Sequence, residues 1–115
     1  DLGPAMSDTV FVTYTSIGNE ILPAKFALRQ NYPNPFNPTT TIAYDLPIAS
    51  DVKMSIYNVK GQKVAELING SVDAGYQTVE WDGRNSFGAQ VATGVYFYRI
   101  EAGNFVQTRK MILIK

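Results

Sequence analysis

Three closely spaced prolines restrict this chain more than any other feature of its sequence. They stand in an octet that reads Asn31, Tyr32, Pro33, Asn34, Pro35, Phe36, Asn37 and Pro38. Each proline removes a backbone donor and fixes its own φ angle, and it disfavours helical geometry in the residue before it. This proline octet therefore excludes a helix or a central strand. It predicts a stiff, irregular crossing segment on which Tyr32 and Phe36 pack as apolar plugs.

The composition excludes several classes of function. Ten basic and ten acidic residues give a formal net charge of zero, which argues against an electrostatic grip on nucleic acid or on an anionic membrane. The chain has no cysteine and no histidine, so disulfides, thiolate metal sites and a histidine general base are excluded. A hydrophobic share of 45% over 115 residues is typical of one globular domain. We expect no cofactor.

Short β-prone segments follow one another along the chain, separated by turn residues at intervals of roughly 8–12 residues. The predicted strands are 9–15, 26–30, 39–46, 51–58, 63–68, 76–82, 95–102 and 105–114. This pattern is typical of an all-β fold in which seven to eight antiparallel strands form a two-sheet β-sandwich.

Glycine pairs indicate where the chain reverses. The segment 58–62 predicts a type I turn in which Gly61 takes a positive φ, and the pair 103–104 predicts a two-residue type II′ hairpin. Asn69 and Gly70 predict a turn after the strand 63–68, followed by a break at Gly75.

The chain divides into a leader, residues 1–25, and a β-sandwich domain, residues 26–115. Within the leader, 9–15 reads as a strand that could belong to an upstream domain, and 16–25 reads as a linker because it contains Gly18, Asn19 and Pro23. Residues 1–14 lack the basic start and the apolar middle of a signal peptide. If the protein is exported, its export signal lies upstream and this chain is a fragment.

No catalytic or metal site is predicted. The acidic residues are scattered over strands and turns, and no histidine or cysteine is present to serve a nucleophile, so we expect a protein that is not an enzyme. In the loop 82–88, Asp82, Asn85 and Ser86 offer oxygen ligands for a cation. Aspartate and asparagine also bond to the backbone of their own turns, and we favour the turn.

The aromatic and basic residues allow two interpretations each. Exposed aromatic rings could form a sugar-binding platform, but a two-sheet sandwich buries such rings, and we favour the core for Trp81, Phe97 and Tyr98. Arg99 either faces solvent and covers apolar surface or pairs with a partner's carboxylate. The same alternatives stay open for Lys110 and Lys115.

Five motifs stand in order along the chain. They are the proline octet, the hairpin segment 58–62, Trp81-Asp82-Gly83, the strand motif of Gly94, Tyr96 and Arg99, and the basic-apolar end with Arg109, Lys110 and Lys115. Together they resemble the type A C-terminal sorting domain of the type IX secretion system, which Bacteroidetes and related bacteria append to cargo proteins. The chain also resembles the immunoglobulin-like domain of the flagellar hook-capping protein. The resemblance covers residues 26–115, and Arg109 stands where the sorting family often has lysine.

The resemblance implies an immunoglobulin-like fold and a non-catalytic sorting role. The upstream cargo would pass through the periplasm, and the outer-membrane secretion machinery would then recognise the domain. A sortase-like protease would cut within 16–25 and leave the cargo at the cell surface or outside the cell. The candidate recognition residues are Gly94, Tyr96, Arg99, Gly103, Arg109, Lys110 and Lys115, whereas the octet with Trp81, Asp82 and Gly83 is a structural motif.

Two other classes of function stay open, namely an accessory polysaccharide-binding module of a glycoside hydrolase and a passive structural domain. The oligomeric state is also open. The strand 105–114 is apolar and close to the C-terminus, so we further expect it at a sheet edge, where secretion machinery could add a strand of its own.

Overall fold

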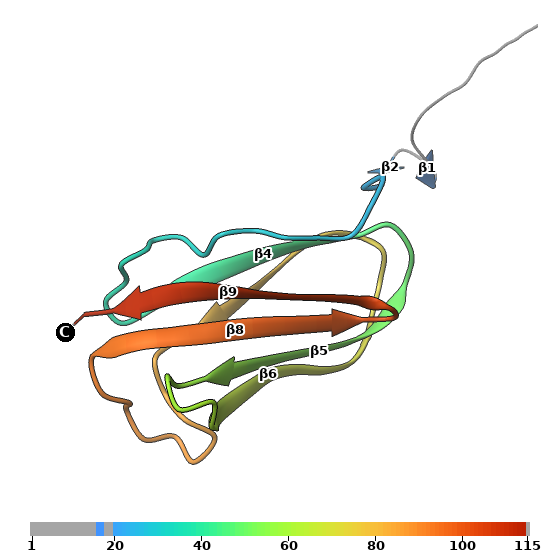
Figure 1. The fold of residues 1–115 in the computed structure, drawn as a ribbon. Helices are drawn as coiled ribbons and strands as arrows, with labels where there is room; N and C mark the ends of the chain where they lie inside the picture. The colour runs from blue at the N-terminus through green and yellow to red at the C-terminus, as the bar shows by residue number, and fades with distance from the viewer. Residues whose placement is uncertain (1–15, 18–19, 115) are drawn as a thin grey trace, which may run out of the picture.

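The computed structural model describes residues 16–17 and 20–114, and the regular structure there is all β-strand (Figure 1). Seven strands form two antiparallel sheets. The three-stranded sheet has the order β3 (Ala27–Leu28), β4 (Thr40–Leu46), β7 (Gly75–Trp81). The four-stranded sheet has the order β6 (Lys63–Val72), β5 (Ser50–Tyr57), β8 (Gly94–Ala102), β9 (Phe105–Leu113). The predicted antiparallel β-sandwich is confirmed.

Alternating side chains direct one apolar face of each sheet inward. The buried side chains include Ile42, Tyr44 and Leu46 of β4, Val52, Met54 and Ile56 of β5, and Tyr98 and Ile100 of β8. They form one core cluster with Trp81 and Leu113. The core interpretation is therefore confirmed for Trp81 and Tyr98, whereas Phe97 is half-buried and points to the outer face between two inward tyrosines.

The positions of two predicted turns are confirmed. In the turn 58–62, Gly61 has a φ of 82° and its N–H donates to the Asn58 carbonyl over 3.0 Å. At the other end of the sandwich, Gly103 has a φ of 59° and begins the tight hairpin between β8 and β9.

The turn predicted at Asn69 and Gly70 is wrong, because β6 continues through both residues to Val72. Asn69 lies opposite Lys53 of β5, and Gly70 lies opposite Val52. A continuous ladder with β5 satisfies their backbone groups, and this outweighs the local turn preference of the pair. The chain reverses later, just before Gly75, whose φ is 142°.

Ser55 combines an outer-face position with burial. It lies between Met54 and Ile56, which both point into the core, and it faces Glu66 and Arg99 in the register of the neighbouring strands. Its side chain is nevertheless only 2% exposed, and its Oγ has no hydrogen-bond partner within the described residues.

The leader contributes one small element. The strands β1 (Ser16–Ile17) and β2 (Glu20–Ile21) pair with each other inside the predicted linker and lie outside the sandwich (Figure 1). The predicted strand 9–15 lies outside the described residues.

Candidate functional site

The proline octet, the Trp81-Asp82-Gly83 turn and the end of β9 meet at one end of the sandwich, which we call the octet end. The Phe36 N–H donates to the Ile112 carbonyl over 2.9 Å, and the Ile114 N–H donates to the Phe36 carbonyl over 2.9 Å. The Ile112 N–H donates to Asn34 Oδ1 over 3.0 Å. The octet therefore pairs with the outer edge of β9, nearly eighty residues further along the chain.

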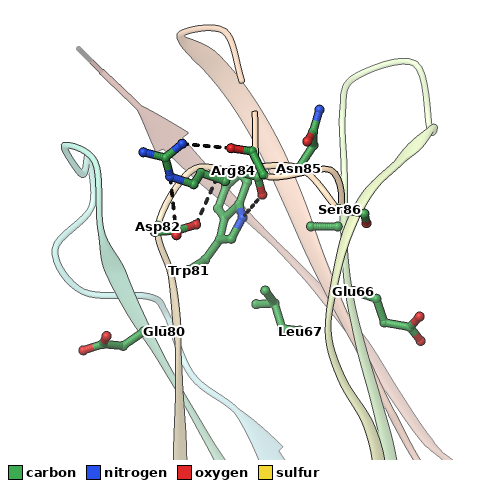
Figure 2. Close-up of a pocket in the computed structure, with 10 residues that line it drawn as sticks. Glu66, Leu67, Glu80, Trp81, Asp82, Arg84, Asn85 and Ser86 are labelled. Atoms are coloured by element: carbon green, nitrogen blue, oxygen red, sulfur yellow. Dashed lines mark hydrogen bonds and ion pairs between the residues drawn. The ribbon is translucent and has the colours of Figure 1, made fainter. Parts of the chain in front are cut away.

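Aromatic packing closes the octet end. Trp81 is 2% exposed, and its ring centroid lies 5.7 Å from that of Phe36 and 5.4 Å from that of Tyr96. Its Nε1 donates to the Arg84 carbonyl over 2.8 Å (Figure 2). Phe36 thus acts as an apolar plug, as predicted. The same prediction for Tyr32 is wrong, because its side chain is 79% exposed.

Gly83 completes this packing. It has a φ of 75°, and a Cβ atom added there would lie 3.2 Å from the Pro38 carbonyl oxygen and 3.7 Å from the Leu113 side chain. Both the backbone conformation and the close approach of the octet favour glycine. The motif residues are thus joined to one another by direct contacts.

Asn31 fixes the start of the octet from inside the protein. It is 2% exposed, and its Nδ2 donates to Thr40 Oγ1 over 2.9 Å and to the Pro33 carbonyl over 3.2 Å. Its N–H donates to the Tyr98 hydroxyl over 2.9 Å, and that hydroxyl donates to the Arg29 carbonyl over 2.7 Å. Burial raises the pKa of Tyr98, so the phenol stays protonated and can donate.

Arg29 lies two residues before the start of the octet and binds the buried carboxylate of Asp45 on β4. Its Nε donates to Asp45 Oδ1 over 3.2 Å, and its Nη2 donates to Oδ2. This hydrogen bonding and the charge of Asp45 raise the pKa of Arg29. The pair satisfies a buried carboxylate and holds the chain against β4 where it enters the octet.

Tyr96 forms a second tyrosine anchor at the start of β8. Its hydroxyl donates to the Ala92 carbonyl, four residues upstream, over 2.6 Å, and burial raises its pKa. A tyrosine bonded in this way to the backbone just before its strand is a hallmark of immunoglobulin sandwiches.

The candidate recognition residues do not form one site. Gly94 pairs with Leu113, and Tyr96 is buried at the octet end, whereas Gly103 lies at the opposite end. Arg109 points inward, and its Nε donates to the Leu28 carbonyl over 2.6 Å. Lys115 lies outside the described residues.

Two exposed cations remain of this set. Arg99 and Lys110 lie on the outer face of the four-stranded sheet. Arg99 Nε lies 3.5 Å from Glu101 Oε2, an exposed ion pair on its own strand. Exposed pairs of this kind contribute little to stability, so the guanidinium can change partners.

The loop 82–88 is a self-bonded turn, as predicted. Asn85 Oδ1 accepts the Phe87 N–H over 2.9 Å and the Ala89 N–H over 3.0 Å, and Asp82 Oδ1 accepts the Arg84 N–H over 3.1 Å. These are the oxygens that a cation would need. Within the described ranges, no group of three or more acidic side chains gathers to hold a metal ion.

A shallow pocket lies beside this loop, between the free edges of β6 and β7 (Figure 2). Three acidic residues line it. Glu66 and Glu80 come from opposite sides and point away from each other, and Asp82 contacts Arg84 (Figure 2). Glu66 also lies 4.0 Å from Lys63, as an exposed ion pair. The pocket therefore lacks the paired, facing carboxylates that most glycoside hydrolases use.

One exposed aromatic side chain was not predicted from the sequence. Phe87, inside the polar loop, is 94% exposed. Its sequence signal was present, since a large aromatic residue between two turn-forming residues, Asn85 and Gly88, has no strand neighbours to bury it.

Comparison with known proteins then places the domain. A family model described as the FlgD Ig-like domain matches residues 34–105, more than half of the chain. The chain belongs to this family. The family is an immunoglobulin-like domain and not a catalytic family, and no curated protein matches the sequence significantly.

Three solved structures share the fold. Dimeric latent PorU from Porphyromonas gingivalis has a TM-score of 0.63 at 19% identity, over 80% of this chain and 10% of PorU. PorZ, described as an essential surface component of the type IX secretion system of the same organism, has a TM-score of 0.52 at 20% identity, over 78% of this chain and 11% of PorZ. FlgD from P. aeruginosa has a TM-score of 0.52 at 23% identity, over 69% of this chain and 67% of FlgD.

The chain thus spans about a tenth of PorU and of PorZ. Among the residues that the structure describes, no helix has the length and apolarity needed to cross a membrane.

Proposed function

We propose that this immunoglobulin-like domain is the non-catalytic C-terminal sorting module of a cargo protein that uses type IX secretion. The observation that carries the proposal is the interlocking of the octet, the Trp81-Asp82-Gly83 turn and the end of β9. The motifs that resemble the sorting family in sequence form one contiguous structure. The fold shared with PorZ, a component of that system, supports the same assignment.

In this proposal the partners are the outer-membrane secretion machinery, a sortase-like protease that cuts within 16–25, and the upstream cargo domain. The cargo would pass through the periplasm to the cell surface or the medium. Arg99 and Lys110 are the recognition candidates that the fold leaves exposed. Tyr96 and Arg109 act through the structure, because their polar atoms already bind backbone carbonyls.

The contacts of β9 limit where a partner strand could add to its edge. Strand β9 does lie at a sheet edge. Its outer backbone groups at Ile112 and Ile114 already bind the octet, and the Lys110 carbonyl accepts Gln30 Nε2 over 2.9 Å. A partner strand would have to displace these contacts to pair with β9 from Lys110 onward, so side-chain recognition is the simpler route there.

A reporter fusion tests the proposal. The full chain, residues 1–115, is fused behind a periplasm-directed reporter in a bacterium that has the type IX machinery, and the reporter is measured in periplasm, outer membrane and medium. We expect the fusion to leave the cell and a fusion lacking 26–115 to accumulate in the periplasm. Export that is independent of residues 26–115 would instead indicate a passive structural domain.

Point variants then test the exposed cations. Replacing Arg99 and Lys110 together by alanine should reduce export, whereas Lys53→Ala, an exposed cation on the same sheet face, should not. Equal export by both variants would remove these two residues from the recognition surface. Binding of insoluble polysaccharide by the purified chain would favour the glycan-binding alternative.

A further inference from the structure

Phe87 is the most exposed of the large apolar side chains in the described part of the chain, at 94%. Leaving a whole aromatic ring in water forgoes the favourable burial that such a ring normally provides. A single exposed apolar residue needs no explanation by itself. Phe87 differs because of how it is held and what surrounds it.

The loop that carries Phe87 is rigidly built. Asn85 Oδ1 accepts the two hydrogen bonds described above. In addition, the Gly88 N–H donates to the Asn85 carbonyl over 2.9 Å, and Arg84 Nη1 donates to the Gly88 carbonyl over 2.8 Å. The Ser86 N–H donates to the Val64 carbonyl over 3.1 Å, which ties the loop to β6. Figure 2 shows Arg84, Asn85 and Ser86 in this loop. The ring is thus presented with little backbone entropy left to lose on binding.

A second apolar tip stands at the same end of the sandwich. Val59, in the turn 58–62, is 69% exposed. This turn is fixed in the same manner, since Asn58 Oδ1 accepts the Lys60 N–H over 2.9 Å and the Gln62 N–H over 3.0 Å. Two grooves flank the turn, one towards Phe87 and one towards Arg99 on the outer face of the sheet.

The charged residues that line these grooves are cations, and the carboxylates paired with them, Glu66 with Lys63 and Glu101 with Arg99, lie outside the linings. The groove towards Phe87, about 540 Å³ in volume, is lined by Asn58, Gln62, Lys63, Val64, Val91 and Tyr96 with the loop. The groove towards Arg99, about 320 Å³, is lined by Tyr57, Val59, Phe97 and Thr108 with parts of the turn. Among the described residues, Lys63 and Arg99 are the charged residues lining them, and no carboxylate does. Lys60 adds a third exposed cation on the turn between the grooves.

We propose that Phe87 and Val59 are the apolar anchors of a protein-docking surface at the octet end, and that the partner offers an apolar pocket rimmed by carboxylates. Rigid aromatic anchors are the residues that dominate such interfaces. The cations around the anchors favour a complementary acidic rim, which fixes orientation and accelerates encounter. That the partner belongs to the secretion machinery rests on the proposed function; the docking chemistry does not.

Export of the reporter fusion gives the first test, with Phe87→Ala compared against Tyr76→Ala. Tyr76 is 63% exposed but lies near the opposite end of the sandwich, on β7 beside Asp45. We expect Phe87→Ala to lower export at least tenfold and Tyr76→Ala to leave it unchanged, with both variants unfolding at the same denaturant midpoint as the parent. Parental export by Phe87→Ala, while the parent fusion is exported, overturns a docking partner in the secretion machinery. A lowered denaturant midpoint of Phe87→Ala overturns the docking role of the ring itself, because an exposed docking ring does not stabilise the fold.

A binding test separates this proposal from the sorting role. A photo-crosslinking phenylalanine analogue is placed at position 87 or, as the control, at position 76 of the purified full chain. Each is irradiated with detergent-solubilised outer membrane. We expect one protein adduct specific to position 87, which excess parent chain suppresses at a concentration about 30-fold lower than the Phe87→Ala chain requires. The adduct should also weaken with added salt.

The outcomes of the two tests are distinguishable. If the parent fusion is not exported but the adduct forms as described, the sorting role fails and the docking surface stands. If the adduct is a second copy of this chain, a different partner protein is ruled out. If the two chains compete equally, Phe87 is not an anchor, and an adduct that is insensitive to salt rules out the carboxylate rim.

Discussion

Tyr98→Phe tests whether the hydroxyl at the centre of the sandwich holds the octet in place. The Tyr98 side chain is fully buried, and its hydroxyl joins the Asn31 N–H to the Arg29 carbonyl. Without it, the Asn31 N–H loses its partner in a buried site, which costs roughly 1–3 kcal/mol. The Arg29 carbonyl belongs to an exposed residue and can be rehydrated, so it adds only about 0.5–1 kcal/mol. These contributions sum to about 1.5–4 kcal/mol, and we expect a loss near the middle of this range, about 2–3 kcal/mol.

This loss is measurable by urea unfolding and by calorimetry. For a domain of this size, each kcal/mol lowers Tm by roughly 4–8 °C, so Tyr98→Phe should melt about 10–20 °C lower with an unchanged m-value. The control is Tyr76→Phe, whose exposed hydroxyl should matter by less than about 0.5 kcal/mol. Equal stability of Tyr98→Phe and the parent would refute the anchoring role of the hydroxyl.

Three further predictions concern single features of the fold. Gly83→Ala should lower the free energy of unfolding in urea by about 1–2 kcal/mol more than Gly88→Ala does. Both positions have a positive φ, but only at Gly83 would an added Cβ meet the Pro38 carbonyl, at 3.2 Å. Equal losses would contradict this contact. Ser55→Ala should be neutral or stabilising by up to about 1 kcal/mol, since it removes a buried hydroxyl without a partner in the described residues; a clear loss would reveal a hidden partner. Burial raises the pKa of three tyrosines in the folded chain, so the unfolded chain loses these phenolic protons at lower pH. The denaturant midpoint should therefore be steady below about pH 9 and fall above about pH 10. A midpoint that does not change with pH would count against their burial. These tyrosines are Tyr44, Tyr96 and Tyr98.

The strands could be predicted because the sandwich repeats one physical rule. Alternation along 39–46 and 51–58, and the glycine at position 61, determine which residues are buried and where the chain turns. Asn69 and Gly70 were mispredicted because a turn preference acts over two residues, whereas the ladder with β5 acts over the whole strand. Long-range pairing of this kind is not encoded in any short window of sequence.

The site was harder to predict than the fold. The octet was correctly predicted to be irregular, but its pairing with Ile112 and Ile114 joins segments far apart in the chain and has no local signal. Motif membership grouped Tyr96, Arg99 and Arg109 as recognition residues, although the structure uses the first and the last as internal hydrogen-bond donors. Exposure, which decides what a partner can touch, depends on the packed fold.

The route of the chain through the sandwich also determines how the domain responds to tension. The first sheet strand, β3, begins at one end of the sandwich, and β9 runs towards the other end, where it leaves at Ile114 (Figure 1). A pull between Leu22 and Ile114 therefore acts along the strands and loads the β8–β9 ladder in shear, so that its hydrogen bonds share the load. The hydrogen bonds between the octet and β9 add further resistance at the end where β9 is pulled. A domain connected in this way should unfold at a higher force when it is pulled between its two ends than when a pull separates one edge strand from its sheet.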